Sequence, residues 1–153
     1  MYRLIFVLGF VFSIMGILNG QEIVKDKKFD PDKIKSELAE KYKLYNGKLE
    51  DQTVELWDSY FLKSENIGNM HEGMPEIGWK TFHENTVKFV ESQYEGELLM
   101  NNIEIYPINS NTAWVKGIMI TRINDKTYQS TFYDSLVKTV DGWRVVLSVV
   151  NNA

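Results

Sequence analysis

A change in hydrophobic period after Gly96 constrains the fold of this chain more than any other feature. Before Gly96 apolar residues recur every three or four positions, whereas after it they alternate with polar residues one by one. The first pattern is typical of amphipathic helices and the second of strands that bury one face. Four long strands, rich in β-branched and aromatic residues, are therefore predicted over 98–106, 112–122, 127–140 and 143–150.

Short connections join these predicted strands, which makes neighbouring strands antiparallel. The connections are 107–111, Asn124-Asp125 and Asp141-Gly142. Asp-Gly is a strong hairpin signal because a two-residue turn that matches the twist of the strands needs positive φ angles. Strands of this length twist and curl when they form a sheet, so one face becomes concave and is available for helices to cover.

Three helices are predicted before the strands. The first begins with Asp30 as N-cap and Pro31 in the first turn, and Asn46-Gly47 ends it. A second begins near Glu50, and a third runs from Gly78 to about Gln93. Residues 63–70 are rich in Gly and Asn, which favours a loop or a short hairpin.

The first twenty residues have the layout of a secretory signal. Arg3 precedes an uninterrupted apolar run, and Asn19-Gly20 follows it. We expect cleavage near Gln21 and export to the periplasm or the medium; an uncleaved membrane anchor is the alternative. The chain then divides into a signal peptide (1–20), a linker (21–29) and one domain (30–153), a size that needs no disulfide to hold a core.

Charge and residue content exclude several classes of function. The formal net charge is −4, the lysines are scattered among acids, and there is no cysteine. A surface that follows nucleic-acid phosphates is therefore not expected. The pairs His71-Glu72 and His83-Glu84 lack the HExxH spacing of a zinc site, and successive side chains diverge on a helix or a strand, so we expect no metal and no cofactor.

Three stretches together carry a resemblance to a known superfamily. They are Gly78-Trp79 after a proline-containing loop, "NTAWVKG" at 111–117 and "LVKTVDGWRVVLSVV" at 136–150. In this order they resemble the nuclear transport factor 2-like superfamily, particularly its SnoaL-like branch. The resemblance implies an α+β fold in which three N-terminal helices pack on a strongly curved, mainly antiparallel sheet. That sheet is cone-shaped, as in cystatin-like and nuclear transport factor 2-like proteins, and a pocket lies at its open end.

The superfamily includes ketosteroid isomerase, polyketide cyclases, epoxide hydrolases and members without a known activity, so the fold does not select a function. By the resemblance, the general base of the isomerases falls near Asn69 or His71, of which His71 can act as a base. Their protonated acid falls near Asp134, which either faces solvent or is buried with a raised pKa. SnoaL-like relatives often carry a His six residues after the Trp of the last strand, where this chain has Val149.

Two functions remain open. The first is an exported domain that binds a small apolar or aromatic molecule, with little or no catalysis. The second is a lyase, isomerase or hydrolase that uses His71 and Asp134 as an acid–base pair. We expect His83 to face inward on the third helix. The residues expected to line the pocket are Trp57, Phe61, His83, Tyr128, Phe132 and Leu147. A homodimer through the outer face of the sheet is expected if Trp114, Ile118 and Ile120 point outward.

Overall fold

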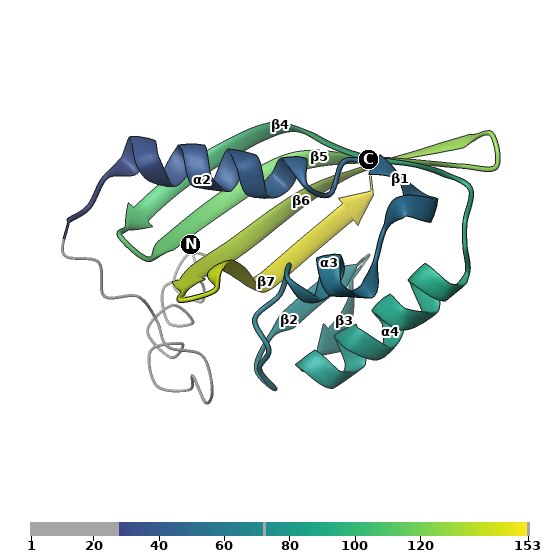
Figure 1. Cartoon of the computed structure of the whole chain (residues 1–153), viewed down its shortest axis with the longest axis horizontal. Coiled ribbons are helices and arrows are strands. Elements are labelled where there is room, and N and C mark those ends of the chain that lie inside the picture. Colours follow the sequence, from purple (N-terminus) through teal and green to yellow (C-terminus); the bar gives the residue numbers. More distant parts are fainter. Residues whose placement is uncertain (1–27, 72, 153) are drawn as a thin grey trace.

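The computed structural model describes residues 28–71 and 73–152. The predicted signal peptide and most of the predicted linker lie outside these residues. The described part is an α+β fold with one large curved sheet and few helices (Figure 1). Within it, no helix is both long enough and apolar enough to cross a bilayer.

Seven strands form the sheet in the order β1-β4-β5-β6-β7-β2-β3. The four long strands are confirmed and pair as antiparallel neighbours. Three short strands lie among the helices, so the helices do not all precede the sheet. The strand bounds are β1 Gly47–Lys48, β2 Gly68–His71, β3 Met74–Ile77, β4 Gly96–Asn109, β5 Thr112–Ile123, β6 Lys126–Thr139 and β7 Gly142–Asn152.

Two of the three hairpins of the meander turn differently. Asn124 and Asp125 have φ angles of 49° and 62°, the paired positive values of a tight hairpin turn. Between β6 and β7 the two linking residues are Val140 and Asp141, because Gly142 already pairs with Thr139. Gly142 has a φ of 103°, so the hairpin predicted here exists, but its glycine lies just after the turn.

A β-bulge in β7 changes which side chains face inward. Ser135 pairs with Leu147 but Leu136 pairs with Val145, so Val146 is the extra residue. An extra residue reverses the alternation of the strand beyond it. Inward-facing positions are therefore Trp143 and Val145 before the bulge, and Ser148 and Val150 after it.

Three helices lie on the inner side of the sheet (Figure 1). Helix α2 (Pro31–Lys43) begins as predicted, with the Asp30 side chain accepting from the backbone N–H of Lys33. It runs along the long strands of the sheet. Helices α3 (Val54–Asp58) and α4 (Trp79–Glu91) lie together with the β2–β3 hairpin, away from α2. The hairpin confirms one of the two alternatives left open for the segment before α4.

The second predicted helix is much shorter than its sequence pattern indicates. A 3-10 turn covers Leu49–Asp51, and α3 has five residues. The chain leaves the helix because Tyr60, Phe61 and Leu62 are buried against the sheet. Backbone hydrogen bonds from Val145 N to Tyr60 O (2.8 Å) and from Leu62 N to Val145 O (2.9 Å) join this segment to β7. The structure thus uses an extended segment where helical spacing predicted a longer helix.

A half-buried polar contact fixes α2 to the end of the sheet. Glu37 accepts hydrogen bonds from Lys138 Nζ (2.8 Å) and from the indole Nε1 of Trp143 (2.8 Å). Burial raises the pKa of Glu37, but the bonds from Lys138 and Trp143 outweigh it and hold the pKa below its ordinary value. The tryptophan of the "DGW" stretch therefore anchors a helix, and its ring is buried.

Candidate functional site

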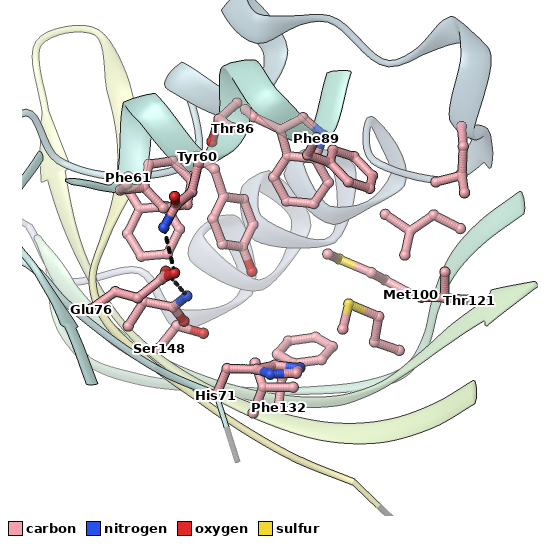
Figure 2. A pocket seen from close by; sticks show the side chains of 18 residues that line it. Tyr60, Phe61, His71, Glu76, Thr86, Phe89, Met100, Thr121, Phe132 and Ser148 are labelled. Atoms are coloured by element: carbon pink, nitrogen blue, oxygen red, sulfur yellow. Dashed lines mark hydrogen bonds between the residues drawn. The ribbon is translucent and has the colours of Figure 1, made fainter. Parts of the chain in front are cut away.

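A cavity of about 310 Å3 lies between the inner face of the sheet and α3, α4 and the β2–β3 hairpin (Figure 2). Its walls are largely aromatic and aliphatic. Figure 2 shows Met100 and Thr121 on one side, with Phe61, Glu76 and Ser148 on the other. The lining residues are Leu49, Trp57, Tyr60, Phe61, Asn69, His71, Glu76, Phe82, Asn85, Thr86, Phe89, Leu98, Met100, Met119, Thr121, Phe132, Ser148 and Val150.

One polar cluster stands on this wall. The carboxylate of Glu76, on β3, accepts from Asn69 Nδ2 at 2.9 Å and from Asn85 Nδ2 at 2.6 Å. Asn69 lies opposite Glu76 in the β2–β3 hairpin, and Asn85 belongs to α4. His71 is two residues after Asn69 on β2, so both side chains lie on the same face of the strand. The cluster therefore joins the hairpin to α4 across the cavity wall.

A second polar group lies behind the wall. Asp134 is 2% exposed, and its Oδ2 accepts from Tyr42 at 2.6 Å and from Tyr60, whose ring lines the cavity. Its Oδ1 is buried without a hydrogen-bond partner of good geometry in the described residues. Burial raises the pKa of Asp134, and the hydroxyls of Ser148, Tyr42 and Tyr60 counteract this only in part. The pKa of Tyr60 is raised well above its ordinary value, first by burial and then by Asp134.

Lys41 borders the same network on α2. Its ammonium group donates to Ser59 O and to the Tyr45 hydroxyl, each at 3.3 Å, and lies 5.0 Å from the centre of the Tyr60 ring. Burial, followed by the charge of Arg144, lowers the pKa of Lys41 to about 7. The amine is therefore partly neutral near neutral pH.

Four of the residues predicted for the site line the cavity: Trp57, Phe61, His71 and Phe132. Asp134 faces inward, which selects the buried alternative over the solvent-facing one, but it reaches the cavity through Tyr60 and Ser148. His71 and Asp134 thus belong to the same sheet, but His71 lines the cavity, whereas Asp134 is buried beside Tyr60 and does not line it.

Three predicted pocket residues lie elsewhere. His83 is on the edge of α4, where Nδ1 is 2.9 Å from Asp58 Oδ1 and the side chain is 41% exposed. Tyr128 is 51% exposed because it belongs to the end of the β5–β6 hairpin that projects beyond β7 (Figure 1). Leu147 is turned to the outer face by the bulge in β7.

The sequence reasoning missed Tyr60, Glu76, Asn85 and Ser148. Plain alternation from Trp143 turns Leu147 and Val149 toward the pocket, which predicts a last strand without a polar group there. The bulge corrects this, since Ser148 is the residue that faces the cavity. The bulge leaves no signal in the sequence. Asn85, in contrast, could have been found from helical spacing, because it lies three positions after Phe82 and next to Thr86 on the inner face of α4.

Comparisons with known proteins establish the fold. No protein-family model matches the sequence, and no curated protein sequence matches it. A nuclear transport factor 2-like protein of unknown function from Shewanella oneidensis is similar, with a TM-score of 0.62 and 18% identity, over 78% of this chain and 96% of that one. A proposed scytalone dehydratase from Novosphingobium aromaticivorans has a TM-score of 0.60 and 13% identity, over 78% and 81% of the two chains.

A proposed ketosteroid isomerase from Shewanella frigidimarina has a TM-score of 0.57 and 11% identity, over 74% of this chain and 91% of that one. These identities are low, so the likeness concerns the fold and not the chemistry. The chain has the nuclear transport factor 2-like fold, also described as cystatin-like in a similar protein from Nostoc punctiforme.

Proposed function

We propose that this protein binds a small apolar or aromatic molecule in the cavity and catalyses little or no chemistry on it. The observation that carries the proposal is the cavity itself, whose volume of about 310 Å3 is at the lower end of the range for small-molecule sites. Aromatic rings from three elements form its walls: Trp57 from α3, Phe89 from α4 and Phe132 from β6. Such walls suit a flat or hydrocarbon ligand.

The arrangement of the polar groups supports binding more than catalysis. An acid–base pair requires both groups within hydrogen-bond reach of a bound substrate. His71 lines the cavity and meets this condition in part. Asp134 is not part of the wall, and its Oδ2 already accepts from the hydroxyls of Tyr42 and Tyr60.

Two substitutions at adjacent residues test the proposed binding. Met119 lines the cavity, whereas Ile118 precedes it on β5 and faces the outer side of the sheet. We expect Met119→Trp to fill the cavity and to abolish binding of compounds found by thermal-shift screening of hydrophobic and steroid-like molecules. Ile118→Trp adds the same ring on the other face and should leave the affinity unchanged.

The expected affinity is modest. At about 0.3 kcal/mol per non-hydrogen atom, a ligand of about 20 atoms binds with a dissociation constant of tens of micromolar. A screen in which no compound stabilises the wild type, or in which Met119→Trp binds as well as the wild type, would contradict the proposal.

A second candidate function rests on Tyr60. Its hydroxyl is held by a buried carboxyl of raised pKa and its ring lines the same cavity as His71, which is the composition of an acid–base site for a lyase, isomerase or hydrolase. In that case His71→Ala and Asp134→Asn should each lower turnover about 100-fold or more, because each removes a group that stabilises the transition state. For a binding domain, ligand affinity survives both substitutions and turnover stays undetectable.

We further propose that two copies of the chain associate through the outer face of the sheet. Trp114 is 41% exposed there and pairs with Tyr106 on β4. Tyr133 on β6 is also exposed on this face and pairs with Lys116, two residues after Trp114. Exposed apolar surface of this kind usually marks an interface. Export of the protein, guided by residues 1–20, remains part of the same proposal.

A further inference from the structure

The charges on the cavity wall are of one sign. Glu76 is the acidic residue among the described residues that line the cavity, and none of those residues is a lysine or an arginine. His71 is the remaining titratable base on the wall. Lys41 lies behind Tyr60, where its ammonium group is engaged by Ser59 O and the Tyr45 hydroxyl. A ligand in the cavity therefore meets a carboxylate and no permanent positive charge among these residues.

The carboxylate of Glu76 keeps free acceptor capacity within this cluster. Asn69 and Asn85 each donate one amide N–H to it, one to each carboxylate oxygen. Each carboxylate oxygen accepts one of these bonds and has capacity for another. A donor group on a ligand can therefore add to the two amide hydrogen bonds without replacing them.

Aromatic rings line the same cavity as this cluster. Phe61 and Phe82 have ring centres 4.1 Å apart, and Phe61 is 5.1 Å from Tyr60. All three line the cavity, and Figure 2 shows Phe61 and Tyr60 on the side of Glu76. Aromatic faces beside a carboxylate attract organic cations, through the ring quadrupole and through the charge.

We propose that the ligand is an organic amine, with a protonated amino group at Glu76 and an aromatic or hydrocarbon body between the aromatic walls. This inference rests on the proposed binding function and specifies the ligand class of the same cavity. An ammonium group supplies donors to the two carboxylate oxygens of Glu76. A carboxylate or phosphate ligand would instead face a fixed negative charge without a cation to balance it.

Calorimetry with three ligands of matched shape tests the proposal. The ligands are naphthylethylamine, naphthylethanol and naphthylacetate, which share a two-ring body and differ in the charge of the head group. At pH 7 the amine is protonated, as lysine is. We expect the amine to bind about tenfold more tightly than the alcohol, equivalent to about 1.4 kcal/mol, and naphthylacetate to bind most weakly.

Two glutamate substitutions locate the effect. Glu76→Gln should reduce the preference for the amine over the alcohol to about threefold or less, because it removes the charge and keeps the size of the side chain. Glu84→Gln removes the same charge from the exposed side of α4, where Glu84 faces Lys80, and should leave the preference intact. A preference that survives Glu76→Gln, or equal binding of amine and alcohol to the wild type, overturns the amine inference while the binding function stands.

Failure of all three ligands to bind the wild type overturns the binding function together with the inference.

A second test uses the wild type alone, so it remains valid if the Glu76→Gln variant does not fold. Salt weakens attraction between charges, so raising the ionic strength should reduce wild-type affinity for the amine and leave that for the alcohol unchanged. Equal salt dependence for the two ligands refutes the ion pair.

Discussion

The protonation state of Asp134 has a measurable consequence for stability. Because burial raises its pKa, folded Asp134 holds a proton over a pH range in which the unfolded chain has released it. The folded state then binds more protons than the unfolded state, so the free energy of unfolding falls as pH rises. The contribution is complete below the ordinary pKa of 3.8 and is lost as pH rises through the raised value.

Asparagine imitates the protonated acid, since its amide oxygen can still accept from Tyr42 and Tyr60. We expect Asp134→Asn to unfold at pH 7 with a free energy within about 1 kcal/mol of the wild type, or higher, and to remove the fall between acidic and neutral pH. Asp134→Leu leaves both buried tyrosine hydroxyls without an acceptor. At about 1–3 kcal/mol for each unsatisfied group, that substitution should cost about 2–6 kcal/mol.

The assay is urea unfolding of the wild type and both variants at several pH values up to and including 7. This range avoids Lys41, whose pKa of about 7 makes stability rise with pH above neutrality. The refuting result is a loss of about 3 kcal/mol or more in Asp134→Asn at pH 7, because losses of that size are typical when one member of a buried ion pair is removed. Asp134 would then be ionised and stabilised by charge.

Four other predictions concern separate parts of the molecule. Glu37→Gln should lower the free energy of unfolding at neutral pH by about 1–2 kcal/mol and should remove the loss of stability on acidification that a lowered pKa implies, both followed by urea unfolding. Gly117→Ala should cost about 1–3 kcal/mol by thermal unfolding, because a Cβ there would lie 2.5 Å from Cζ of Phe132; an unchanged midpoint would show that the ring yields freely. Trp114→Glu should convert a dimer to a monomer in sedimentation at micromolar concentration, and a monomeric wild type would refute the interface. Mass spectrometry of secreted protein should find Gln21 at or near the N-terminus, whereas intact Met1 in a membrane fraction would contradict cleavage.

The long strands could be predicted because alternation is a local property. Each of the four follows from its own residues, and the turns at Asn124-Asp125 and before Gly142 mark their ends. The orientation of Leu147 could not be predicted in this way. It depends on one extra residue at Val146, and a single bulge reverses every position after it.

The candidate site was predictable where one element decides it. Phe61 and Phe132 each belong to an apolar face that their own segment shows in the sequence, and both line the cavity. An inner face of α4 centred on Trp79 would turn His83 inward. The buried residues of the helix are instead Phe82 and Thr86, and Trp79 packs beside His83 at the edge, with ring centres 5.6 Å apart. The Glu76 cluster combines a hairpin with a helix, and such pairings depend on tertiary contacts that no single stretch encodes.

The parallel pairing of β2 with β7 affects how the chain folds. It joins Gly68 to Leu147, residues about 80 positions apart, whereas the hairpins of the meander join near neighbours. Closing a long loop costs entropy before its contacts form, so distant pairs tend to form late. The meander can therefore assemble first, and both α2 and the wall that carries Asn69 and His71 join it in later steps. The same wall is a natural place for the native molecule to open, so access to its interior need not await global unfolding.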